Sequence, residues 1–166
     1  MKIRDDHMYH GAALIQIAED QNFTAINSLR VKNKIVRSAY KVNDHIAVYF
    51  KHAVNTTPRF KEFVFTFTTE HIKAIQALAT AHEKTFIALV CVKAREICAI
   101  TADQLNTLIA ARKKAKGGAE DQYTVLVTAP AGKSLRVYMN HPGVRKTILG
   151  DPVIVSRNAF PTDLFV

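Results

Sequence analysis

The chain has 166 residues, of which 48% are apolar and 22% are charged. This length fits a single domain with a sizeable core, and the composition excludes a disordered chain. Lys and Arg number 23 against 14 Asp and Glu, a net charge of +9, so nucleic acid is the first class of partner to consider.

Hydrophobic periodicity predicts alternating helices and strands in the first half of the chain. Helical spacing predicts a helix over 7–20, and strand-forming residues predict a hairpin over 32–54, whereas 21–31 fits neither pattern clearly. A third strand is expected over 62–68, followed by a helix over 70–82. The residues expected on the buried face of the first helix are His10, Leu14, Ile17 and Ala18.

The second half continues with a nearly all-apolar strand over 85–92 and another over 96–100. Thr101 and Gln104 form a capping-box pattern that begins a helix, and Gly117 follows its basic end. Further strands are expected over 123–129, 134–140 and 152–157. These elements predict one α+β domain over 1–166, with a mixed sheet and flanking helices in a core over 7–110 and a C-terminal hairpin within 120–166.

Two features bear on the compartment of the protein. Cys91 and Cys98 lie in apolar strands, which favours buried, reduced thiols over disulfides or a zinc site. The first residues do not resemble a signal peptide, and no apolar stretch has the length of a membrane span. We therefore expect a cytoplasmic protein that does not enter a membrane.

The segment Gly132-Lys133-Ser134 matches the end of a nucleotide-binding P-loop. Val127 stands where that motif has its first glycine, and the residues after Ser134 form a strand pattern rather than a helix. A helix N-terminus is what would hold the phosphate. The sequence therefore predicts a hairpin turn that binds no nucleotide.

The stretches "HIAVYFKHA" and "TFIALVCVKAREICAITADQLNTLI" carry a resemblance. In the order helix, strand, strand, strand, helix, strand, residues 7–110 resemble the restriction-endonuclease-like core of the PD-(D/E)XK nuclease superfamily. The resemblance implies Mg²⁺ held by carboxylates, with Lys51 at the position of the catalytic lysine. Tyr49 replaces the acidic residue two positions earlier, and no aspartate lies near Arg37, so the family site is absent as written.

Other residues offer alternatives for a metal site. A displaced site would take oxygen ligands from acids that are otherwise solvated at the surface: Glu19, Asp20, Glu62 and Glu70. A second alternative combines His7 and His10 with Asp5 and Asp6, although acids in a first helical turn also favour the helix dipole.

The basic groups point to nucleic acid, with DNA favoured over RNA. The residues expected to contact it are Arg37, Lys51, Arg112, Lys113, Lys114, Lys133 and Arg136. The leading hypothesis is a nucleic-acid-binding protein on a nuclease-like core with a degenerate or displaced active site. An active Mg²⁺-dependent nuclease with migrated carboxylates and a non-catalytic protein-interaction module are the alternatives, and a homodimer stays open.

Overall fold

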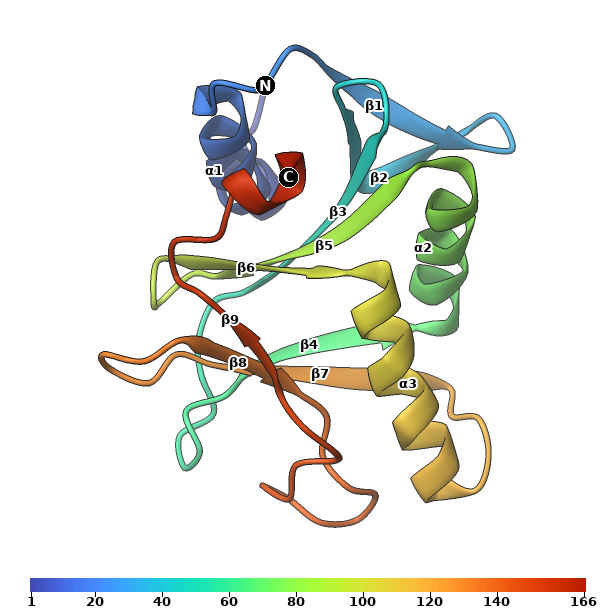
Figure 1. The fold of residues 1–166 in the computed structure, drawn as a ribbon, viewed down its shortest axis with the longest axis vertical. Coiled ribbons are helices and arrows are strands. Elements are labelled where there is room, and N and C mark those ends of the chain that lie inside the picture. The colour runs from blue at the N-terminus through green and yellow to red at the C-terminus, as the bar shows by residue number, and fades with distance from the viewer.

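A computed structural model describes residues 1–166 as one α+β domain built on two sheets (Figure 1). The strands of the first sheet are β1 (Ile26–Val31), β2 (Lys34–Val42), β3 (Ile46–Ala53), β5 (Lys84–Cys91) and β6 (Glu96–Thr101), in the order β1-β2-β3-β5-β6. This sheet is mixed, because β3 and β5 run parallel while the other neighbours are antiparallel. The predicted α+β class with a mixed sheet is confirmed.

The second sheet is antiparallel and lies below the first in Figure 1. Its strands are β4 (Phe63–Thr68), β7 (Gln122–Thr128), β8 (Leu135–Tyr138) and β9 (Val153–Val155), in the order β4-β7-β8-β9. The strand predicted over 62–68 therefore forms as β4, but it belongs to the second sheet. The first sheet instead contains β1, which lies in the stretch 21–31 that periodicity left unassigned. Alternate phenylalanines of β4 are buried where the two sheets face each other, so β4 belongs opposite the first sheet.

Three helices cover the sheets: α1 (Asp5–Glu19), α2 (Thr69–Ala81) and α3 (Ala102–Lys116). The hydroxyls of Thr68 and Thr101 accept hydrogen bonds from the third residue of α2 and α3, as N-caps do. Gly117 ends α3 with φ of +84°, a conformation that glycine adopts without strain. None of the helices combines the length and apolarity that crossing a bilayer requires.

The two faces of the first sheet pack into separate cores. The larger core fills the space between the two sheets and is closed by α2 and α3. The smaller core lies between the opposite face, α1 and a C-terminal 3₁₀ helix, Thr162–Phe165, which lies beside α1 in Figure 1. On α1 the buried residues are His10, Ala13 and Ile17; Ala18 is exposed, so its predicted place on the inner face is wrong.

Two local predictions are confirmed. Cys91 and Cys98 are free and buried, and burial raises the pKa of the Cys91 thiol to about 12. The segment that carries Gly132 connects β7 and β8, which pair antiparallel, and no helix begins there. Gly132 has φ of +69°, in keeping with a tight turn.

Candidate nucleic-acid interface

Tyr49 and Lys51, the two candidate catalytic residues, lie on the face of β3 that points into the larger core. The Lys51 ammonium donates to the carbonyl oxygen of Thr66 at 2.5 Å and lies 3.3 Å from His71 Nδ1. It also sits 4.8 Å from the centre of the Phe67 ring. Lys51 thus satisfies a backbone carbonyl of β4, which is an edge strand of its sheet.

The surroundings of Tyr49, Lys51 and His71 favour the uncharged form of each side chain. Burial lowers the pKa of Lys51 and raises the pKa of the Tyr49 phenol, which is only 6% exposed. Burial and the neighbouring Lys51 charge lower the pKa of His71. A phenol that stays protonated is a poor ligand for Mg²⁺, which prefers carboxylate and carbonyl oxygens.

The acids proposed for a displaced metal site are dispersed. Glu19 and Asp20 end α1, Glu70 lies in the first turn of α2, and Glu62 precedes β4. No group of three or more His, Cys, Asp or Glu side chains is close enough to hold a metal ion.

Glu62 differs from the solvated acid that the sequence suggested. It is 4% exposed, and its carboxylate accepts a hydrogen bond from the Tyr138 hydroxyl. Burial and this carboxylate raise the pKa of Tyr138. No pattern in the sequence indicates this pair, because 76 positions separate the two residues.

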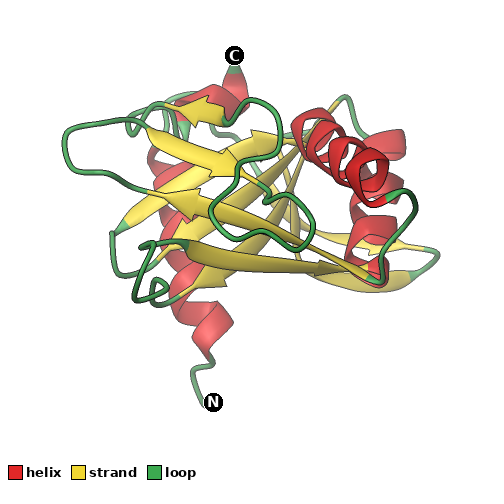
Figure 2. Ribbon diagram, turned by 90° about the horizontal axis from the view of Figure 1, so that it is seen from below, coloured by secondary structure: helices red, strands yellow, loops and turns green.

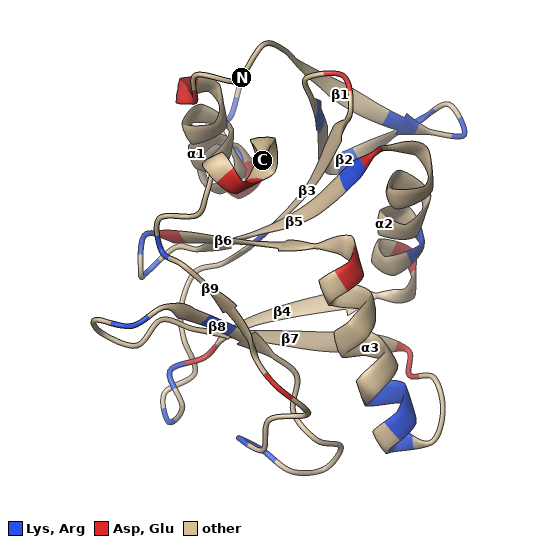
Figure 3. Cartoon of the chain, viewed as in Figure 1, with Lys and Arg blue, Asp and Glu red and all other residues tan.

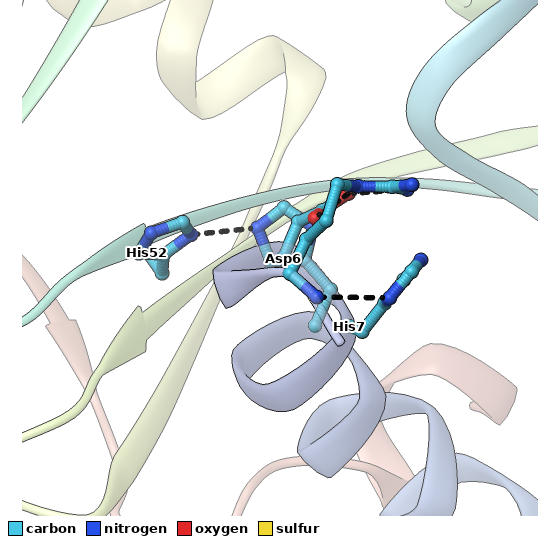
Figure 4. Close-up of polar contacts among 5 residues, drawn as sticks. Asp6, His7 and His52 are labelled. Carbon is cyan, nitrogen blue, oxygen red and sulfur yellow. Dashed lines mark hydrogen bonds and ion pairs between the residues drawn. The ribbon is translucent and has the colours of Figure 1, made fainter. Parts of the chain in front are cut away.

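The histidines of α1 do not share a ligand site. His7 Nδ1 accepts the backbone N–H of Arg4 at 3.2 Å, and Asp6 pairs with the Arg4 side chain at 3.0 Å. His10 instead contacts β3, where its Nε2 lies 3.0 Å from Nδ1 of His52. Figure 4 labels His7 and His52, and separate dashed lines mark their two contacts. The alternative cluster is therefore not formed, because His7 and Asp6 contact Arg4 whereas His10 contacts His52.

The outer face of the second sheet carries a group of basic residues. Residues 122–150 contain no Asp or Glu. The four cations of this segment, which we call the second-sheet surface, are Lys133, Arg136, Arg145 and Lys146. All four are exposed, and none takes part in an ion pair, since the three ion pairs of the chain lie elsewhere.

Strand periodicity explains how these side chains reach the surface. On β8, Leu135 and Val137 point into the larger core, so Arg136 between them points outward. Lys133 lies in the β7–β8 turn, and the loop that follows β8 brings Lys146 over the buried ring of Tyr138, 5.7 Å from its centre. Figure 2 views the molecule from this side, with the loops running across the strands.

A pocket of about 820 Å³ opens on the same side of the molecule. It lies between the loop that contains Phe60 and the loop that contains Asn140 and Arg145, with Arg59 also in its lining. The side-chain oxygen of Asn140 is buried without a hydrogen-bond partner. The lining also contains Glu62 and Glu120, whose carboxylates are engaged by Tyr138 and Arg112. The face is therefore grooved, and the acids in the groove already have protein partners.

The structure divides the predicted nucleic-acid contacts into several places. Lys133 and Arg136 belong to the second-sheet surface, and Lys113 and Lys114 are exposed on the last turn of α3, at the opposite end of the same sheet (Figure 3). The others are elsewhere: Arg37 is exposed on β2, Lys51 is inside, and Arg112 pairs with Glu120.

Each of the three guanidinium nitrogens of Arg112 has a protein partner. Its Nε and Nη2 bind the two carboxylate oxygens of Glu120 at 2.6 and 3.1 Å, and its Nη1 donates to the Asn140 carbonyl at 2.7 Å. This fork raises the pKa of Arg112 and lowers that of Glu120. Arg145 and Lys146 also belong to the basic groups of the sequence but were not among the expected contacts, although the long acid-free run around them is visible in the sequence.

No protein-family model, no curated protein and no solved structure matches this chain. The geometry and the charges of its own residues are therefore the basis for assigning a function.

Proposed function

We propose that this protein binds nucleic acid, duplex DNA foremost, through the second-sheet surface and without sequence preference. The observation that carries the proposal is a segment of 29 residues, 122–150, that displays four unpaired cations and contains no acid. Lysine and arginine side chains that lack carboxylate partners are free to neutralise phosphates. Lys113 and Lys114 at the end of α3 are exposed as well, at the opposite end of the second sheet.

The expected binding is electrostatic. Each phosphate contact releases counterions, so log K falls linearly with log salt by about 0.9 per contact. About four to six contacts give a slope near −4 to −5, and affinity at physiological salt is expected in the range of about 10⁻⁴ to 10⁻⁶ M.

A binding role is favoured over phosphodiester hydrolysis. The ammonium of Lys51 already serves the Thr66 carbonyl, and the four candidate acids are not gathered into a ligand set. We therefore propose a core that resembles restriction-endonuclease-like nucleases and whose active site is degenerate. Nicking of plasmid by the wild-type protein in the presence of Mg²⁺ and its loss in Lys51→Met would overturn this part of the proposal.

The binding proposal is tested by charge reversal with a matched control. Lys133→Glu/Arg136→Glu alters the second-sheet surface, and Lys73→Glu/Lys93→Glu makes the same change in net charge at two exposed lysines without ion pairs, on α2 and in the β5–β6 turn. Affinity for duplex DNA is measured by fluorescence anisotropy from about 50 to 200 mM salt, the range in which such contacts change affinity most clearly. The first variant should bind more weakly and show a shallower slope, by about 1.8, while the control changes little. Equal losses would show that only net charge matters and contradict the proposal.

A further inference from the structure

The β1–β2 hairpin is a second basic element, separate from the second-sheet surface. Residues 21–43 contain no Asp or Glu. The hairpin cations, as we call them, are Arg30, Lys32, Lys34 and Arg37. All four are exposed and none forms an ion pair.

The hairpin has the shape of a two-stranded ribbon. Lys32 and Asn33 form its turn, both with positive φ, at 51° and 63°, as in the tight turns that suit strand twist. The cross-strand partner of Val31 is Lys34, and that of Arg30 is Ile35. A ribbon of two strands fits the major groove of B-DNA, which is about 12 Å wide.

Packing fixes which side of the ribbon is available. Val31 and Val36 pack against the larger core. Arg30 and its partner Ile35 are exposed on the other side. Ile35 is a large apolar residue and is 56% exposed. The cations thus occupy the tip and the free face of a ribbon whose other face is held by the protein.

The two basic elements lie at opposite ends of the molecule. In Figure 3 the hairpin is at the top right, whereas the β7–β8 turn and the loop after β8 lie in the lower half, along the longest axis of the protein. α2 and the start of α3 lie between them, and each carries an acid in its first turn, Glu70 and Asp103. α2 also carries the exposed Lys73, so these two helical segments place two acids against one cation between the basic elements.

We propose that the hairpin cations form a second phosphate-binding surface, so that one copy of the protein bridges two duplexes. The inference rests on the proposed function, because it assigns the other duplex to the second-sheet surface. A single surface neutralises one segment of DNA. Two surfaces that face away from each other hold two segments and turn a binding protein into a cross-linking one.

A capture experiment tests the bridge. One random-sequence duplex of about 20 base pairs, roughly two helical turns, is fixed to beads, and a second carries a fluorophore. The full-length protein is added at low salt, and the labelled duplex retained on the beads is measured. The wild-type protein should retain it, and competition with excess unlabelled duplex should release it.

Three variants that each replace two cations separate bridging from self-association. Arg30→Glu/Lys34→Glu should lose capture at least about fivefold and still bind a single duplex through the other surface; Lys133→Glu/Arg136→Glu should behave in the same way. Lys73→Glu/Lys93→Glu, which alters two exposed lysines outside both surfaces, should capture like the wild type. A dimer that used one surface twice would leave capture intact in the hairpin variant, and that result overturns the inference.

The remaining outcomes are also decisive. Single-duplex binding by the wild type without any capture overturns the bridge and leaves the proposed function standing, whereas no binding to either duplex removes both. Arg30→Gln/Lys34→Gln gives a milder hairpin variant if the reversed one does not fold, as judged by circular dichroism. It should also lose capture, and full retention of capture by this folded variant counts against the bridge.

Discussion

Polar residues have opposite roles in two regions of the molecule: the contacts between neighbouring elements, which we call the seams, and the second-sheet surface. At the seams, His10, Lys51, Arg112 and Arg157 each bind a protein partner contributed by another element. Arg157 spans three partners, since it donates to Glu96 and to the carbonyls of Pro130 and Lys133. On the second-sheet surface, none of the four cations has a carboxylate partner.

This difference separates residues that hold the fold from residues that remain free for a ligand. A partly buried cation is retained because a carbonyl or carboxylate compensates for its lost hydration. An exposed cation without a partner contributes little to folding and keeps its full capacity for phosphate. Changes at the seams should therefore act on stability, and changes on the surface should act on binding.

The largest effect is expected from the seam between α1 and β3. His10 is 7% exposed, and burial, with the charge of His52 and of Lys51 behind it, lowers its pKa to about 4. An unfolded histidine has a pKa of about 6.5, so the unfolded chain binds this proton first as the pH falls. The contribution of neutral His10 to the free energy of unfolding is fully present above pH 6.5. It is lost as the pH falls towards 4, by up to about 3 kcal/mol. Urea unfolding at several pH values measures this change in the free energy of unfolding.

His10→Phe isolates this contribution, because a phenyl ring fills a similar volume beside Phe50 and does not titrate. The variant should show a flatter dependence on pH between 6.5 and 4. Asp163, whose pKa burial raises, acts in the opposite direction in both proteins and cancels in the comparison. Parallel curves for the two proteins would mean that His10 is not the titrating group.

A smaller effect is expected at the seam between β3 and β4. Lys51→Met keeps the apolar stem over Phe67 but removes the ammonium that binds the Thr66 carbonyl. Leaving such a carbonyl without its partner costs about 1–2 kcal/mol. The free energy of unfolding should fall by that amount, while affinity for duplex DNA stays within about twofold. A large loss of affinity in the folded variant would place Lys51 in the binding surface after all.

The sequence predicted the local elements better than their assembly. The capping box of Thr101 and Gln104 and the stop at Gly117 depend on neighbours within a few residues, so these predictions were correct. The sheet that β4 joins depends on its pairing with β7, more than 50 residues away. Periodicity shows that one face of a strand is buried but does not identify the strand that pairs with it.

The same limit applies to the charged residues. Arg112 and Lys133 look alike in the sequence, as members of basic groups. One is fixed by Glu120 and the Asn140 carbonyl, and the other is free in a turn. The difference comes from the partners of Arg112, which lie 8 and 28 positions away in the sequence. A stretch of sequence without acids is a better indicator of an unpaired cation, because a cation without acids nearby in sequence has fewer chances of a local partner.

The smallest effect on stability should come from Lys133→Ala. The backbone of Lys133 has structural contacts, since its N–H donates to Pro130 and its carbonyl accepts from Arg157, and alanine retains both. Its side chain makes no ion pair and is exposed, so the free energy of unfolding should change by less than about 0.5 kcal/mol. Affinity for duplex DNA should nevertheless fall, because one phosphate contact is lost. The salt slope should become shallower by about 0.9, which corresponds to less than about tenfold in affinity at 0.1 M salt. Anisotropy titrations of this variant and of Lys73→Ala measure the difference. An unchanged slope in Lys133→Ala would show that the turn does not touch phosphate, and the free cations of this surface would then lose their assigned role.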